Sequence, residues 1–66
     1  MNLCEAERRL LLAIHEGQEV AEGEDYDTCA RLVDYGLVKG DDISNFKGNR
    51  YGYLKATAIG REVLAA

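Results

Sequence analysis

The chain has 66 residues, of which 47% are apolar and 30% charged, and it contains neither Pro nor Trp. This length allows one domain, residues 1–66, with a thin core, because a chain this short buries only about 60% of its unfolded surface. Such a core leaves little room for the pocket of an enzyme, and the apolar fraction is too high for a disordered chain. No apolar run approaches the roughly 20 residues of a membrane span, so we expect no membrane partner.

The net charge of −4 is unevenly distributed along the chain. Residues 1–35 carry three basic and nine acidic side chains, whereas residues 36–66 carry five basic and three acidic ones. This asymmetry bears on partners rather than on the fold. The acidic front is either a solvated surface or a docking surface for a basic protein. Its candidate residues are Glu19, Glu22, Glu24, Asp25 and Asp27.

Two cysteines, Cys4 and Cys29, are too few for the disulfide framework of a small secreted domain. The first five residues lack the basic and apolar regions of a signal peptide, which predicts a cytoplasmic protein with reduced thiols. Both cysteines fall on predicted helices, where a cysteine is typically a small core residue.

The chain offers little material for a metal or catalytic site. Cys4 and His15 are separated by about 16 Å along one helix, so they cannot bind the same zinc ion. The acidic front lacks the Asp-x-Asp-x-Asp-Gly loop of a calcium site. A catalytic pair of Ser44 and His15 lacks a pocket in which to be buried. We therefore expect no metal, no cofactor and no enzymatic activity.

Apolar periodicity predicts a first helix over residues 3–16. Asn2, with an acid three residues later, predicts its N-cap, and Gly17 predicts its end. Residues 18–25 form an acidic connection, in which Val20 is expected to pack against the core.

A second helix is predicted over residues 26–35, with Asp25 or Asp27 as its N-cap. Gly36 suits the left-handed position that follows a helix. Leu37 then stands where a Schellman motif places its apolar contact with the last turn.

In the second half of the chain, apolar residues recur at every second position instead of at helical spacing. Residues 37–39 and 51–56 predict two strands of a hairpin. The Gly48–Asn49 pair between them is typical of a two-residue turn.

Thr57 predicts the N-cap of a last helix over residues 58–64, with Ile59 and Val63 directed inward. Gly60 allows this helix to approach another element closely. The order of elements is thus helix, helix, hairpin, helix (α-α-β-β-α), which makes the chain a small α+β domain.

Two phrases in the second half resemble a winged-helix domain. Leu32–Val38 is similar to the Leu-x-x-x-Gly-Leu-Val phrase that ends the helix before the wing. Thr57–Leu64 is similar to the Thr-x-x-Gly-x-x-x-Leu phrase that follows the wing. The resemblance covers residues 29–64 and implies a wing hairpin and binding to nucleic acid. The front half departs from the pattern, because one helix instead of two separates the first helix from the wing, so the helix-turn-helix is reduced.

The wing is the better of two candidate nucleic-acid surfaces. The exposed face of the second helix carries two acids, which repel phosphate, beside its candidate contacts Arg31 and Tyr35. In the wing, basic residues alternate with aromatics and amides, a pattern that suits phosphate contact, base stacking or minor-groove entry. The alternative is a solvated hairpin with Phe46 and alternate tyrosines packed inward. The wing candidates are Lys39, Lys47, Asn49, Arg50, Tyr51, Tyr53 and Lys55.

Two functions stay open at this point. The first is a small winged-helix-like regulator that binds DNA through its wing, with a homodimer adding contacts. The second is an acidic protein–protein interaction module or inhibitor, of the phage or mobile-element type, that does not bind DNA.

Overall fold

The computed structural model describes residues 2–66, which form three helices and three strands. The predicted α+β class and the order helix–helix–hairpin–helix are confirmed, with one short strand added between the first two helices. In chain order the elements are α1 (Glu5–His15), β1 (Ala21–Glu22), α2 (Glu24–Asp34), β2 (Val38–Asp42), β3 (Arg50–Ala56) and α3 (Ala58–Ala65).

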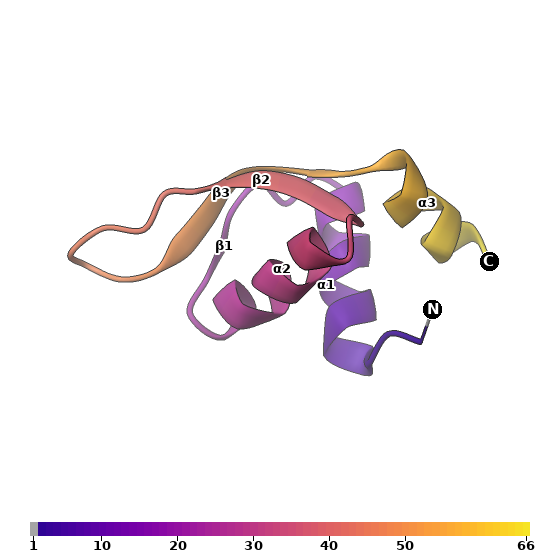
Figure 1. Cartoon of the computed structure of the whole chain (residues 1–66), viewed down its shortest axis with the longest axis horizontal. Helices are drawn as coiled ribbons and strands as arrows, with labels where there is room; N and C mark the ends of the chain where they lie inside the picture. The colour runs from indigo at the N-terminus through magenta and orange to yellow at the C-terminus, as the bar shows by residue number, and fades with distance from the viewer. Residues whose placement is uncertain (1) are drawn as a thin grey trace.

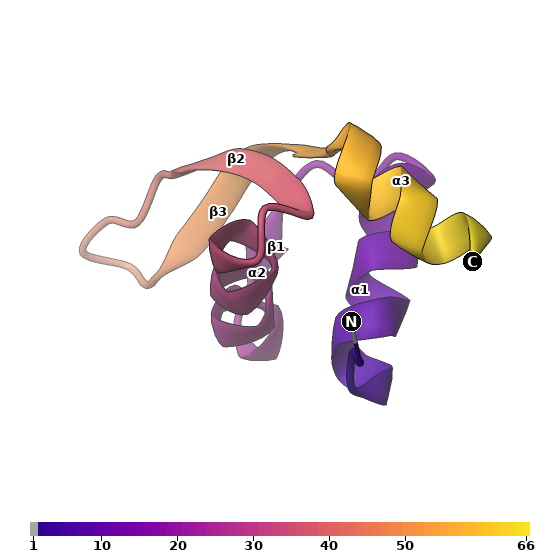
Figure 2. The same ribbon diagram turned by 45° about the vertical axis from the view of Figure 1, so that its right-hand side comes forward.

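The strands form one antiparallel sheet in the order β1-β3-β2. Helices α1 and α2 lie on one side of this sheet, and the β2–β3 hairpin extends beyond them (Figure 1). Helix α3 lies at the opposite end of the molecule, beside α1 (Figure 2). The hairpin makes the molecule elongated, with extents of 39 × 19 × 18 Å. We call residues 38–56 the wing, and its face turned away from the helices the outer face.

Helix α1 begins two residues later than the sequence predicted, and its N-cap is Cys4 rather than Asn2. The backbone N–H of Cys4 donates to Oε1 of Glu7 at 3.0 Å, so Glu7 satisfies the first free donor of the helix. Glu5, the acid expected in that role, instead forms an exposed ion pair with Arg9. The helix leads into Gly17, whose φ of 124° ends it as predicted.

Helix α2 begins two residues earlier than predicted. Its N-cap is Gly23, with a φ of 62°, and neither Asp25 nor Asp27 fills that position. Both acids lie in the first turn instead, where the helix dipole favours carboxylates.

The Schellman motif predicted at the end of α2 is confirmed. Gly36 has a φ of 79°, and its N–H donates to the carbonyl of Val33 at 3.0 Å. The N–H of Leu37 donates to the carbonyl of Leu32, also at 3.0 Å, and both leucines are fully buried. The turn thus directs the chain from α2 into β2.

The acidic connection contains strand β1, which the sequence did not predict. Ala21 pairs with Tyr51 of β3 and is fully buried, whereas Val20 is 40% exposed. The prediction that Val20 packs inward was therefore wrong. Pairing with β3 decides which side chain faces the core, and two residues are too short for an alternating pattern to reveal this.

Helix α3 starts as predicted, with Thr57 Oγ1 accepting from the N–H of Gly60 at 3.0 Å. The Thr57 hydroxyl also donates to the carbonyl of Gly36 at 2.7 Å and ties α3 to the end of α2. A Cβ on Gly60 would lie 2.1 Å from the carbonyl oxygen of Leu37, so only glycine fits this contact. Val63 is half-buried, but Ile59 is 56% exposed and does not face inward as predicted.

One apolar core lies between the helices and the sheet. Its fully buried side chains include Leu11 of α1, Cys29 and Leu32 of α2, and Leu37 of the turn after α2. The burial of Cys29 raises the pKa of its thiol to about 11, so this cysteine is a protonated core residue at neutral pH.

Candidate nucleic-acid interface

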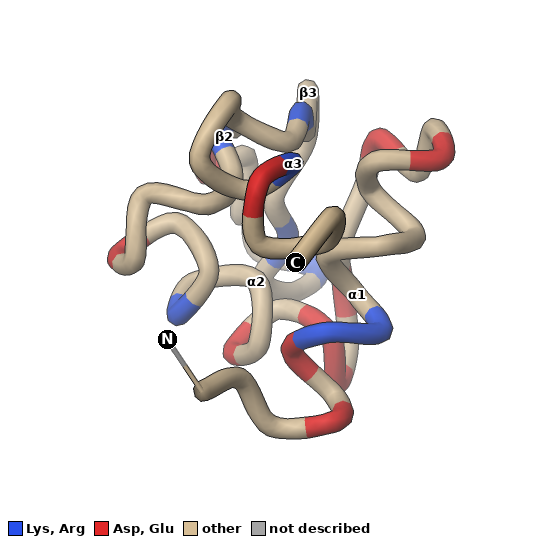
Figure 3. The backbone as a smooth tube through the Cα atoms, turned by 90° about the vertical axis from the view of Figure 1, so that its right-hand side faces the viewer, with Lys and Arg blue, Asp and Glu red and all other residues tan. Residues whose placement is uncertain are grey.

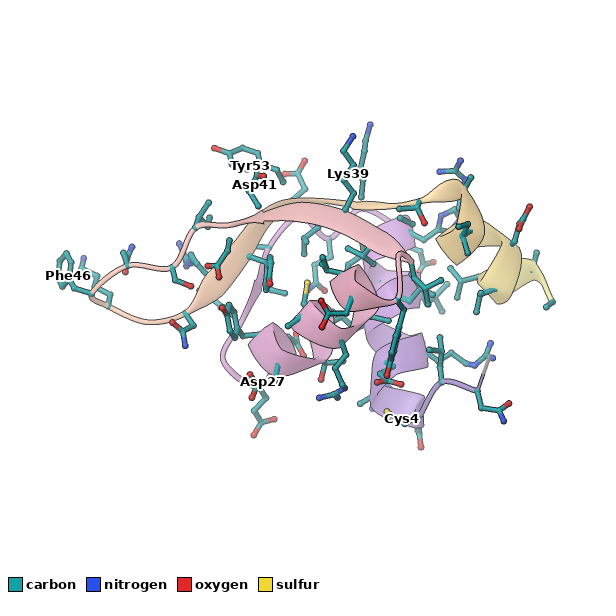
Figure 4. All side chains as sticks on the ribbon, in the orientation of Figure 1. Cys4, Asp27, Lys39, Asp41, Phe46 and Tyr53 are labelled. Carbon is teal, nitrogen blue, oxygen red and sulfur yellow. The ribbon has the colours of Figure 1, made fainter. Side chains whose placement is uncertain are left out.

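Two lysines face each other across the wing. Lys39 of β2 is the register partner of Lys55 of β3, and both side chains are exposed. Their chain neighbours Val38 and Leu54 are buried against the helices, so alternation places both lysines on the outer face. Lys39 points away from the helices in Figure 4. No carboxylate among residues 2–66 lies within 4.0 Å of either ammonium group.

Tyr53, two residues before Lys55, lies on the same outer face next to a β-bulge. Between the pairs Lys39–Lys55 and Asp41–Gly52, β3 has one residue more than β2. Tyr53 takes up this residue with a φ of 57°, the one positive φ of a non-glycine residue in the described chain. Its side chain is 76% exposed and lies beside Asp41 in Figure 4. The strained backbone therefore presents an aromatic ring to solvent.

The tip of the wing is a tight turn at a different place from the prediction. Asn45 and Gly48 exchange backbone hydrogen bonds of 3.0 and 3.1 Å, so the turn residues are Phe46 and Lys47 rather than the predicted Gly48–Asn49 pair. Asn45 Oδ1 also accepts from the N–H of Lys47 at 2.8 Å, as an Asx turn requires. A type I turn prefers Asn at its first position and Gly at its fourth, as Asn45 and Gly48 provide. This preference decides the position of the turn over the Gly48–Asn49 pair.

Phe46 is 94% exposed at this tip and does not pack inward as one alternative had it. The ammonium Nζ of Lys47 lies 5.9 Å from the centroid of the Phe46 ring, within the range of a cation–π contact. Figure 4 shows Phe46 at the far end of the hairpin, away from every helix. Phe46 was not among the predicted wing candidates, although its place between Asn45 and Gly48 indicates a turn that would expose it.

The distal part of the wing is fastened to α2 by a polar and aromatic cluster. The rings of Tyr26 and Tyr51 stack with centroids 5.1 Å apart and an angle of 27° between their planes. The Tyr26 hydroxyl donates to Oδ2 of Asp42 at 2.7 Å, and Ser44 donates its N–H to Oδ1 at 3.0 Å. Hydrogen bonds from Ser44 and Tyr26 lower the pKa of Asp42, and its carboxylate raises the pKa of Tyr26. Tyr51 is therefore a structural contact with α2 and does not share the outer face with Tyr53.

An open groove of about 600 Å³ separates the wing tip from the start of α2. Arg50 forms an ion pair with Glu22 of β1 at its edge, so its charge is already compensated within the molecule. Lys47 and Asn49 line the groove from the wing, and Asp27 lines it from α2. Of the seven predicted wing residues, the structure thus gathers Lys39, Tyr53 and Lys55 on the outer face, with Lys47 at the tip.

The two α2 candidates point to α1. Arg31 Nε donates to Oε2 of the buried Glu7 at 2.8 Å, and the Tyr35 hydroxyl donates to the same oxygen at 3.3 Å. The N–H of Cys4 and the Arg31 guanidinium hold the pKa of Glu7 at about 2, below its ordinary value of 4.5. Arg31 and Tyr35 therefore serve the α1–α2 contact, and desolvation raises the pKa of Tyr35 there.

The acidic candidates lie apart from the outer face. Glu19, Glu24, Asp25 and Asp27 are all exposed, and Asp27 points to the side opposite Lys39 in Figure 4. Figure 3 shows basic positions on β2 and β3, whereas α1 carries both basic and acidic positions.

Residues 2–66 contain no group of three His, Cys, Asp or Glu side chains placed to hold a metal ion. Within the same range, every helix is too short or too polar to cross a bilayer. No protein-family model matches the sequence, and no curated protein or solved structure matches the chain significantly.

Proposed function

We propose that the protein is a small regulator of the winged-helix kind that binds nucleic acid through the outer face of its wing. The observation that carries this proposal is the pair formed by Lys39 and Lys55, directly opposed across two strands and free of acidic partners. Like charges directly opposite each other destabilise a sheet. A bound phosphate between them removes that repulsion and gains two charge-assisted contacts.

The neighbouring residues extend this phosphate site into a strip. Lys47 adds a third cation at the tip, and Tyr53 adds an exposed ring between the tip and the lysine pair. Asp41 is the acid that shares the outer face, which leaves the strip with a net positive charge. An extended row of cations with interspersed aromatic rings fits a nucleic-acid backbone better than a single small anion.

The net charge of −4 does not oppose this proposal, because most acids lie elsewhere on the molecule. Screening in ~0.1 M salt limits interactions between exposed charges to about 10 Å. Helix α2 does not read bases in this proposal, because its Arg31 and Tyr35 both donate hydrogen bonds to Glu7. The wing therefore acts by contact with the backbone, which gives affinity with little sequence selectivity.

The test is fluorescence anisotropy of labelled mixed-sequence DNA at salt concentrations from ~50 to ~200 mM. Replacing both lysines of the pair, Lys39→Gln with Lys55→Gln, should weaken binding and reduce the slope of log K against log salt by about 1, since the pair neutralises one phosphate and each neutralised phosphate contributes about 0.9. The matched control is Arg8→Gln with Arg9→Gln on α1, which removes the same charge from exposed positions outside the wing. Equal losses in the two double variants would contradict a site on the wing.

A second function is favoured by the first turn of α2. Glu24, Asp25 and Asp27 are exposed there, and no Lys, Arg or His group of the described chain lies within 4.0 Å of them. This cluster suits the basic surface of a protein partner, in the manner of an interaction module or inhibitor. Reversing the three charges to Lys should remove such a partner from a pull-down while the lysine-pair variant retains it, and the opposite pattern would contradict this function.

A further inference from the structure

The wing tip presents an aromatic ring on a rigid support. Two backbone hydrogen bonds between Asn45 and Gly48 close the turn, and the Asn45 side chain binds the N–H of Lys47. The Phe46 ring at this turn is 94% exposed, and its described contact is the ammonium group of Lys47. The fold therefore holds the backbone of Phe46 in place without using its ring in the core.

The chemistry around this ring is not that of a general apolar patch. Residues 43–49 contain no acid, one lysine, two asparagines and a serine. Every residue from 41 to 49 is exposed, and the other large apolar residue of this segment, Ile43, is only 36% exposed against 94% for Phe46, so the ring does not join a broad apolar surface. A flat ring with an adjacent cation suits a ligand that is itself flat and joined to an anion, which is the chemistry of a nucleotide.

On this basis, and resting on the proposed function, we infer that Phe46 stacks on an unpaired nucleobase while Lys47 contacts the adjoining phosphate. A base inside a duplex is covered on both faces by its neighbours, and reaching it requires unstacking. A base in a single strand or at a strand junction offers a free face to the narrow tip. The ligand class is therefore DNA that contains unpaired bases, with the outer face of the wing on its backbone.

The absence of Trp from the chain provides a specific reporter for this contact. In the Phe46→Trp variant, indole emission reports the environment of the wing tip alone. We expect it to be quenched by a mixed-sequence single strand and by a duplex with an unpaired flap, and much less by the blunt duplex. The matched control is Ile59→Trp, because Ile59 is 56% exposed on α3, at the other end of the molecule, and its emission should not change.

Affinity provides the second readout. Phe46→Ala should weaken binding to the single strand by about 10-fold, within the range measured for stacked aromatic residues, and leave binding to the blunt duplex unchanged. The variant should melt at the same temperature as the wild type, because the ring is outside the core.

The possible failures can be told apart. Salt-dependent binding that depends on the lysine pair, with no quenching of Phe46→Trp and no loss in Phe46→Ala, overturns the stacking inference and leaves the proposed function intact. No binding of wild-type protein to any DNA at ~50 mM salt overturns both. Blue-shifted emission of Phe46→Trp on anionic lipid vesicles, without quenching by DNA, overturns the inference in favour of a lipid surface.

Discussion

Different forces stabilise the wing and the helical body, by which we mean the three helices and the core that they bury. In the helical body, Leu11, Leu32 and Leu37 are completely inaccessible to solvent, and stability comes from apolar burial. In the distal wing, every residue from 41 to 49 is exposed, and the shape comes from hydrogen bonds of Asp42, Ser44 and Asn45. The distal wing thus keeps its geometry without contributing to the core.

This contrast separates stability from binding in one small domain. A substitution in the body should alter the free energy of unfolding, which is small for a chain of this size. A substitution at Phe46 or Lys47 should alter binding and leave stability almost unchanged.

Leu32→Ala should lower the free energy of unfolding by about 2–5 kcal/mol, because it removes a fully buried side chain and leaves a cavity. Chemical denaturation monitored by circular dichroism would show this as a lower midpoint or as a chain unfolded in buffer. Phe46→Ala is the control from the wing and should change stability by less than ~0.5 kcal/mol. Similar losses in both variants would mean that the tip belongs to the folding unit after all.

Gly60→Ala should cost about 1–3 kcal/mol, because the new Cβ would overlap the backbone oxygen of Leu37, which cannot rotate away as a side chain can. To relieve this overlap, α3 must move away from the turn after α2, which lowers the thermal midpoint. Ile59→Ala, one residue earlier on the exposed side of α3, should be close to neutral. A neutral Gly60→Ala would contradict the close approach of α3 to the α2–β2 turn.

Glu7→Gln should change how stability depends on pH. The pKa of Glu7 in the folded protein is about 2, below its ordinary value of 4.5, so its ionised form stabilises the fold above pH 4.5. This contribution is lost as the pH falls from 4.5 toward 2, and the thermal midpoint of the wild type should fall with it. The variant should melt lower at neutral pH and change less over that acidic range. Glu5→Gln, on the exposed side of the same helix, should follow the wild-type curve, and identical curves for Glu7→Gln would contradict the contact with Arg31.

Local chemistry explains which parts of the fold were predictable. The Schellman turn at Gly36 and the cap at Thr57 were both foreseen, because each depends on residues within a few positions of one another. The close packing of Gly60 followed from the same reading of the last helix. Strand β1 could not be foreseen, because the partner that makes Ala21 a buried strand residue lies 30 positions away at Tyr51.

The candidate site was predictable in composition but not in geometry. The sequence indicated a basic and aromatic wing, yet the division of Tyr51 and Tyr53 between its two faces depends on the bulge at Tyr53. Similarly, the hydrogen bond from Arg31 to Glu7 joins residues of two helices that are 24 positions apart in the sequence, and apolar periodicity does not reveal such a contact. Long-range pairing therefore decides which of the candidate residues remain free for a ligand.

The smallest effect expected is a gain in stability from Tyr53→Asn. Tyr53 holds a left-handed backbone conformation that costs an ordinary residue about 1 kcal/mol or more, whereas asparagine tolerates it well. Because the tyrosine ring is 76% exposed, little packing is lost, and the urea midpoint should rise by the equivalent of about 0.5 kcal/mol. Tyr53→Phe keeps both the strain and the ring and should match the wild type in stability and in DNA affinity. If Tyr53→Asn is more stable yet binds DNA more weakly than Tyr53→Phe, the strain at Tyr53 serves the outer face. A loss of stability in Tyr53→Asn would instead place this ring with the structural residues of the body.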